Sequence, residues 1–254
     1  MTGISRPYRR TARPLSGGNY IRGASSNTTY IGHEKFAREP ENYVRAYLLL
    51  QNDLKRVFEY VEPADRNVAS YSFRIHEILL RACIEVEANC KAVLEENGYS
   101  IRSNWTMEDY KKIEASHRLS VFQVRVPNWR GTNNIRTPFA SFASAPARSP
   151  EWYKAYNATK HDRHINFTMA NFENAVDAVC GVLTLLVAQF TTHDFDPTSS
   201  PFGRGDEGSG FWPAQGSFFT VRFPDDWPEE EHYDLANWNH TKTQPDPVQQ
   251  YPYR

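Results

Sequence analysis

One predicted helix concentrates the side chains that could carry out acid–base chemistry. Asn157, His161 and His164 follow one another at spacings of four and three residues, so a helix places them on one face. Lys160 and Arg163 fall within the same turns. Histidine titrates near neutral pH and can act as a general acid or base, while lysine and arginine can hold a phosphate and stabilise its developing charge. These residue types predict cleavage of a phosphodiester that needs no metal ion.

Each side chain has a distinct role in this hypothesis. His161 is the general acid or base, and Asn157 positions it. Lys160 and Arg163 contact the phosphate, and His164 is a second acid–base candidate. Two other interpretations stay open: a solvated polar face whose histidines complement the helix dipole, or a metal site on two histidines three residues apart. No cysteine or suitably directed carboxylate joins the histidines at a familiar spacing, so we expect neither a metal nor another cofactor.

A second predicted helix carries a row of charged residues that could face the first. Its charged side chains follow spacings of three, four and four residues: Arg74, Glu77, Arg81 and Glu85. The simplest interpretation is a ladder of ion pairs along one helix face. Alternatively, if this helix packs against the histidine-bearing helix, either glutamate could orient His161 or Lys160. The polar set also extends toward the start of the helix: Tyr71, Ser72 and His76.

Hydrophobic periodicity places both groups on the helices of a bundle. Apolar residues recur every three or four positions, and Pro63 and Gly98 are natural helix ends. The pattern predicts these helices: 41–62, 65–97, 106–117, 150–164 and 171–190. Asp65 or Asn67 would cap the second of them. The last is apolar almost all round, which predicts a position at the centre of the bundle. Two further segments predict short strands that pair with each other: 119–126 and 217–223.

Two motifs on these helices resemble a known group of proteins. The first lies on the histidine-bearing helix: Trp152, Tyr156, Asn157, Lys160, His161 and Arg163. The second lies on the charged helix: Tyr71, Ser72, Leu79, Leu80, Cys83, Glu85 and Glu87. A long apolar helix follows the first motif. In these features the chain resembles a group of uncharacterised bacterial proteins and, with them, the HEPN superfamily of helical bundles.

The resemblance implies a mainly α fold and a catalytic motif. The fold would be a HEPN-like bundle of four to five helices over residues 41–192, with a short strand or hairpin and irregular extensions at both ends. Many HEPN proteins carry an arginine, commonly then an asparagine, three further residues and a histidine. Asn157 and His161 keep that spacing, and Tyr156 stands at the arginine position. A substitute arginine would have to come from elsewhere in space: Arg163, Arg74 or Arg81.

The resemblance also implies two alternative functions. Many members of the superfamily are metal-independent ribonucleases of toxin–antitoxin and antiphage systems, and they usually act as dimers. We therefore expect a protein of bacterial defence or stress response that cleaves or binds RNA. Other HEPN-like bundles are inactive, so the alternative is a non-catalytic dimerising module that binds a protein partner. Tyr156 at the arginine position favours this alternative.

The two ends of the chain differ from the bundle in composition and charge. The chain has 29 basic and 30 acidic residues, yet residues 1–40 carry a net charge of +5 and residues 192–254 one of −7. The first segment has no helical or strand period and predicts a flexible basic arm. Such an arm could serve solubility alone. Alternatively, its arginines would contact a nucleic acid backbone: Arg6, Arg9, Arg10 and Arg13. Residues 193–254, rich in proline and aromatic side chains, predict an extension that wraps on the bundle or binds a partner. If it masks the arm, deleting it should strengthen nucleic acid binding.

The sequence predicts a cytoplasmic protein. The N-terminus lacks the apolar core of a signal peptide, and the apolar stretch 175–190 falls short of the roughly 20 residues that a membrane span needs. We therefore expect no role for a membrane, and RNA or a second copy of the chain as partners.

Overall fold

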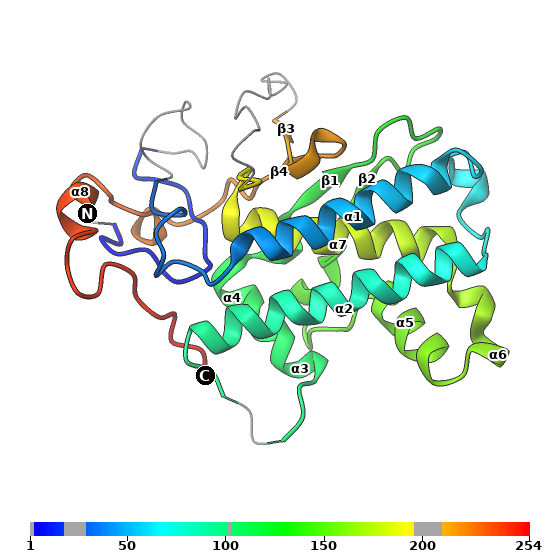
Figure 1. Cartoon of the computed structure of the whole chain (residues 1–254), viewed down its shortest axis with the longest axis horizontal. Helices are drawn as coiled ribbons and strands as arrows, with labels where there is room; N and C mark the ends of the chain where they lie inside the picture. The colour runs from blue at the N-terminus through cyan, green and yellow to red at the C-terminus, as the bar shows by residue number, and fades with distance from the viewer. Residues whose placement is uncertain (1–2, 18–28, 101–102, 196–209) are drawn as a thin grey trace.

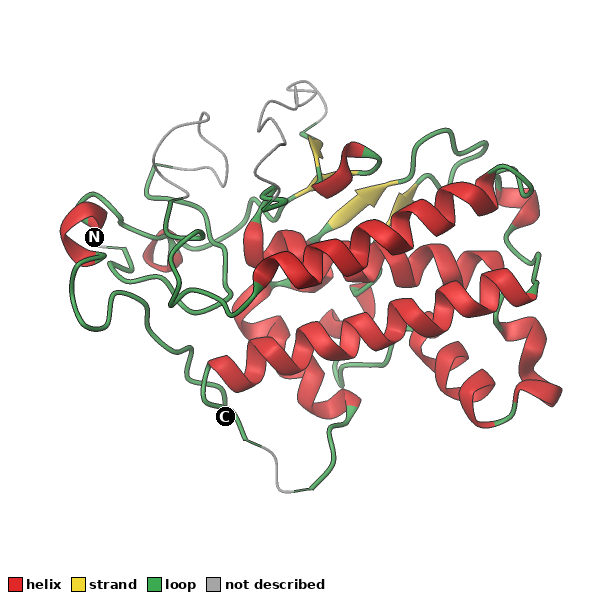
Figure 2. Cartoon of the chain, in the orientation of Figure 1, coloured by secondary structure: helices red, strands yellow, loops and turns green. Residues whose placement is uncertain are grey.

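The core of the molecule is built around one apolar helix. The computed structural model describes residues 3–17, 29–100, 103–195 and 210–254. Its central helix α7 (Phe172–Phe190) packs most extensively on α2 (Phe73–Glu96), and also on α1 (Pro40–Phe58) and α5 (Glu151–His161). Almost every residue of α7 is buried, as its all-round apolar sequence predicts. The chain is mainly helical, as expected (Figure 2).

The length and composition of α7 would allow it to cross a membrane, but its surroundings are protein. Of its most apolar 18-residue window, 83% is buried inside the molecule. Its residues pack against the three other long helices and against strand β1 (Gln123–Arg125). We therefore describe α7 as the core helix of the bundle.

α2 begins later than predicted, because its cap is Ser72 rather than Asp65 or Asn67. The helix begins at Phe73, where the Ser72 hydroxyl accepts a hydrogen bond from the Ile75 N–H at 3.2 Å. Asp65, one of the predicted caps, lies in a single 3₁₀ turn. Its carboxylate accepts hydrogen bonds from Trp129 Nε1 (2.6 Å) and the Thr132 N–H (2.8 Å) instead. These bonds lower the pKa of Asp65 to about 2, so the ionised carboxylate organises a distant loop rather than the helix end.

A small antiparallel sheet covers the bundle beside α7. Its strand order is β2 (Ile135–Arg136), β1, β4 (Thr220–Arg222) and β3 (Trp212–Pro213). The predicted pairing of the two segments is confirmed, since Val124 of β1 lies opposite Val221 of β4. The edge strands β2 and β3 add to the pair of strands that the sequence predicted. The one predicted helix at 106–117 is divided into α3 (Met107–Tyr110) and α4 (Glu114–His117), joined by a 3₁₀ turn.

Both ends of the chain pack on the bundle and on each other. Backbone bridges join Ile4 to Tyr233 and Tyr8 to Gln249. The Tyr233 side chain is fully buried, and its hydroxyl donates to the Thr11 carbonyl at 2.8 Å. In Figure 1 the two termini and α8 (Trp238–Thr241) lie at one end of the bundle, and α6 (Arg163–Asn166) lies at the other.

The predicted division of the chain into arm, bundle and extension therefore needs correction. Residues 3–17 and 29–40 are packed rather than a free arm, and side chains of 210–254 belong to the same hydrophobic core as the helices. The described part of the extension wraps on the bundle, which is one of the two arrangements that the sequence predicted for it. Deleting the extension would expose this core. The deletion therefore does not test whether the extension masks nucleic acid binding by residues 1–40. Residues 18–28 and 196–209 lie outside the described residues.

Candidate active site

An open groove of about 680 Å³ lies where the start of α2 meets the end of α5 and the short helix α6. Ten residues line it: Phe73, His76, Leu80, Thr159, Lys160, His161, Asp162, Arg163, His164 and Phe167. The groove thus joins three histidines and two cations. Four of the five predicted catalytic residues line it, and the fifth, Asn157, lies one turn earlier on α5 and does not.

α2 supplies one wall of the groove. Phe73, His76 and Leu80 follow spacings of three and four residues, so they share one face of the helix. The Ser72 cap fixes the first turn of α2, from which two of these side chains project. The sequence identified His76 only as an extension of a polar set. One signal could have identified it. His76 shares a helix face with the apolar residues Phe73 and Leu80, and such a face is expected to pack against another helix.

His76 is the buried imidazole of the groove. Its side chain is 6% exposed, and its Nε2 finds no hydrogen-bond partner among the described residues. Burial lowers the pKa of His76, and the nearby positive charge of Arg163 lowers it further. The neutral imidazole, the form that can accept a proton, is therefore favoured. A buried nitrogen without a partner beside an open groove is a group that a ligand could satisfy.

Tyr156 positions the lysine of the groove. The tyrosine ring is buried in the core, and its hydroxyl accepts a hydrogen bond from Lys160 Nζ at 3.0 Å. The same ammonium group lies 5.0 Å from the centre of the ring. The hydrogen bond raises the pKa of Lys160, which keeps the side chain charged. Tyr156 thus occupies the position expected for an arginine without entering the groove, while Arg163 brings a guanidinium group there.

The predicted continuous helix through His164 was wrong. α5 ends at His161, and Asp162 leaves the helical conformation with φ −145° and ψ 79°. The Asp162 carboxylate accepts a hydrogen bond from the Ile165 N–H at 3.2 Å and so caps α6. His164 therefore does not share a helix face with Asn157. It still lines the groove, because the break turns the chain back toward α2.

The charged row on α2 does not orient the groove. Arg74 pairs with Glu77 at 2.9 Å, and Arg81 reaches across to Asp53 on α1. Of the predicted ladder, the Arg74–Glu77 pair forms among the described residues, whereas Arg81 pairs with α1 instead of with Glu77 or Glu85. Neither arginine lines the groove, and Glu77 does not line it either, so Glu77 is not placed to orient His161. Burial raises the pKa of Glu85, which also lies outside the groove.

The carboxylate that α2 directs toward α5 is one that the sequence hypothesis did not use. Glu87 accepts a hydrogen bond from the Tyr153 hydroxyl at 2.9 Å. Its negative charge also favours the charged form of Lys160. Glu87, rather than Glu77 or Glu85, is thus the carboxylate of α2 that binds a side chain of α5.

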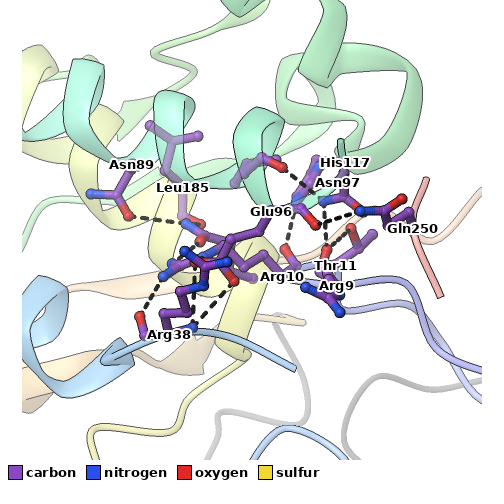
Figure 3. A network of polar contacts seen from close by, with 12 residues as sticks. Arg9, Arg10, Thr11, Arg38, Asn89, Glu96, Asn97, His117, Leu185 and Gln250 are labelled. Carbon is purple, nitrogen blue, oxygen red and sulfur yellow. Dashed lines mark hydrogen bonds and ion pairs between the residues drawn. The ribbon is translucent and has the colours of Figure 1, made fainter. Parts of the chain in front are cut away.

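Two of the four arginines predicted to bind nucleic acid are buried. Arg10 is fully buried and donates to Glu96 at 2.7 Å (Figure 3). It also donates to Gln189 at 3.0 Å. Arg13, 3% exposed, pairs with Glu231 at 2.9 Å. Their carboxylate partners and burial remove them from contact with a polyanion, so this prediction was wrong.

The remaining two arginines lie far from the groove. Arg6 is exposed and donates to the Asp246 carbonyl at 3.2 Å, and Arg9 is half-buried. They belong to the end of the bundle opposite α6 (Figure 1). A phosphate bound at the groove would therefore not also contact them directly.

A larger pocket of about 940 Å³ lies beside the start of α1. Two of its polar residues are engaged within the protein: the Arg38 N–H donates to Glu96, and the Arg38 carbonyl accepts from the buried Arg10 at 2.6 Å. This pocket is the seam where residues 31–43 dock on α2. We therefore assign the candidate site to the groove rather than to this pocket.

No family model, curated protein or solved structure matches the chain. Within the described residues, no group of three histidine, cysteine, aspartate or glutamate side chains is placed to hold a metal ion.

Proposed function

We propose that the groove binds RNA and cleaves it without a metal ion, and that the chain is a HEPN-like ribonuclease of bacterial defence or stress response that acts as a homodimer. One observation carries the proposal, the convergence of five proton-transferring or cationic side chains on one open groove: His76, Lys160, His161, Arg163 and His164. The mainly helical core and the spacing of Asn157 and His161 on α5 support the HEPN-like assignment.

The reaction needs one base and one acid. The 2′-oxygen of a ribose attacks the adjacent phosphorus, and the bond from phosphorus to the next 5′-oxygen breaks. His76, whose neutral form is favoured, accepts the 2′-hydroxyl proton. His161 donates a proton to the leaving 5′-oxygen, and His164 is the second candidate for this role. The products are a 2′,3′-cyclic phosphate and a 5′-hydroxyl.

The two cations of the groove stabilise the phosphate. Lys160 is held by Tyr156, and the Arg163 guanidinium carbon lies 5.3 Å from the centre of the Phe73 ring. Positive groups fixed in place before the substrate arrives lower the barrier, since they need not reorganise as negative charge develops on the phosphoryl oxygens.

The test is cleavage of a labelled RNA by pure protein in the presence of a chelator. We expect wild-type protein to cleave, His161→Ala to abolish cleavage, and His76→Gln to reduce it at least about a hundredfold, as expected for loss of a general acid or base. The His161 side chain is exposed, so the melting temperature of its variant should stay within error.

A matched control is His240→Ala, an exposed histidine on α8 at the opposite end of the bundle. Its cleavage rate should equal that of the wild type. Unchanged cleavage by His161→Ala would retire the catalytic proposal, and chelator-sensitive cleavage would contradict its metal-independent form.

The alternative is a non-catalytic dimerising module that binds a protein partner through the outer face of residues 210–254. The observation that favours it is Tyr156, which is buried in the position expected for a catalytic arginine. Intact RNA in the same assay, together with a dimer in sedimentation experiments, would support this alternative.

A further inference from the structure

We propose that an aromatic ledge beside the groove stacks unpaired bases, so that the substrate is single-stranded RNA. The inference rests on the proposed function, because it names the class of RNA that the same groove receives. We define the aromatic ledge as Tyr71, Phe73 and Phe167.

The ledge is a set of rings in mutual contact at the mouth of the groove. The Phe167 ring lies 4.8 Å from that of Phe73 and 5.4 Å from that of Tyr71. The imidazole of His76 approaches the same Phe167 ring at 5.9 Å. The ledge therefore adjoins the candidate base of the groove.

Two of these rings are exposed and Phe167 is half-buried, although the chain has a large core in which to bury them. Tyr71 is 50% and Phe73 is 60% exposed, and two apolar neighbours on the α6 side are also exposed, Ile165 at 76% and Met169 at 38%. Large apolar side chains exposed together near one groove indicate a binding site.

The ledge is held in place before any ligand binds. The segment before α2 is fixed to the start of α7, because the Phe172 N–H donates to the Ser70 carbonyl at 2.7 Å. A backbone bridge also joins Tyr71 to Asn171. The rings therefore project from a rigid corner between α2 and α7, and binding need not first order them.

The charges beside the ledge select the occupant. Arg163 lies over the Phe73 ring at 5.3 Å and Lys160 lines the same groove, so cations flank the aromatic surface. Rings that stack bases, set beside cations that contact phosphates, are how proteins bind single strands without reading their sequence. In a duplex the bases stack on one another, and their faces are not available to protein side chains. A second copy of the chain docked on this surface would place its own Lys160 and Arg163 near those of the first copy, and the like charges would repel one another.

The test separates binding from cleavage. The probe is an oligonucleotide with 2′-O-methyl riboses, which lacks the attacking hydroxyl, used as a single strand and as a duplex of the same sequence. We expect tighter binding of the single strand. Phe73→Ala and Tyr71→Ala should each weaken it about tenfold, the usual effect of losing one stacking ring.

Control variants identify stacking as the cause. Phe73→Trp retains a flat ring and should restore single-strand affinity, and Tyr60→Ala removes an 87% exposed tyrosine outside the groove and should change nothing. A 2-aminopurine base in the probe should lose fluorescence on binding wild-type protein, and less on binding Tyr71→Ala, since stacking quenches it. Melting temperatures of the variants establish that they fold.

Each contrary result has a distinct meaning. If wild-type protein binds neither probe, the proposed function fails and the ledge fails with it. If it binds both probes equally, or if the ledge variants bind like Tyr60→Ala, the ledge is overturned while RNA binding at the groove stands. If Phe73→Ala instead converts a dimer to a monomer, the ledge is an interface between copies and the inference is wrong.

Discussion

Arg6 and Arg10 are four positions apart in sequence but have different surroundings. Arg6 is exposed and contacts one carbonyl. Arg10 is fully buried and donates to Glu96, to Gln189 and to the Arg38 carbonyl. A buried charge without its partner is far more costly than an exposed one. Single substitutions at the two positions should therefore differ sharply in their effect on stability.

We predict that Arg10→Ala lowers the free energy of unfolding by about 3–5 kcal/mol, because it leaves Glu96 buried and unpaired. Arg6→Ala, the matched control, should change it by less than about 0.5 kcal/mol. Urea denaturation of the three proteins measures both values. The double variant Arg10→Met with Glu96→Leu removes both charges and should regain a large part of the loss. Similar losses for Arg6→Ala and Arg10→Ala would contradict this assignment.

The burial of Arg10 was not predictable from its own neighbourhood. The residues around it are polar, basic and rich in glycine, which is the usual composition of a free arm. Its partners Glu96 and Gln189 are 86 and 179 positions away. The three histidines of the groove illustrate the same limit. Sequence spacing identified His161 and His164, whereas His76 joins them only through the packing of α2 against α5.

At the scale of elements, local signals were correct where periodicity and capping agreed. Asn171 caps the buried helix α7, and its side chain accepts a hydrogen bond from the Asn174 N–H at 3.0 Å, in agreement with the predicted helix 171–190. The end of α5 was missed because the spacing of Asn157, His161 and His164 fits an unbroken helix. Asp162 is also a preferred N-cap, and that signal decides the local structure.

The cap of α2 offers a test at the same scale. Ser72→Ala removes the acceptor of the Ile75 N–H and should lower the free energy of unfolding by about 1 kcal/mol. Ser72→Asp retains an acceptor and should keep most of the stability. Amide hydrogen exchange should increase at Ile75 and His76 in the alanine variant and remain slow at Leu79 deeper in the helix. Equal stability of the alanine and aspartate variants would show that the cap contributes little.

At the scale of the whole molecule, His117 joins α4 to both ends of the chain. Its Nε2 contacts the Arg10 carbonyl at 2.8 Å, and its Nδ1 lies 2.6 Å from the Ser116 hydroxyl. That hydroxyl in turn contacts the Tyr253 hydroxyl. Burial lowers the pKa of His117 to about 4. The neutral imidazole therefore belongs to the folded molecule.

This burial predicts a loss of stability in mild acid. From about pH 6.5 down to about pH 4 the unfolded chain binds a proton at His117 that the folded chain does not, so the free energy of unfolding falls over this window. Asp177 acts in the opposite direction, since burial raises its pKa to about 6 and the folded carboxyl takes up a proton first. Comparison with the non-titrating variant His117→Gln isolates the histidine. Between about pH 7 and pH 5, wild-type protein should lose about 2 kcal/mol relative to the variant in urea denaturation. Parallel stability curves would contradict the burial of a neutral His117.

The contacts between the two ends also imply an order in which the molecule is completed during synthesis. Arg10 binds the side chains of Glu96 and Gln189. The ribosome has added both residues by the time α7 is complete. Arg13 pairs with Glu231, 218 positions later, and its guanidinium lies over the ring of Trp227. A growing chain can therefore dock Arg10 on the helices while Arg13 still lacks its partners. We expect the N-terminal segment to be anchored in two stages, the second only after residues 227–231 have left the ribosome.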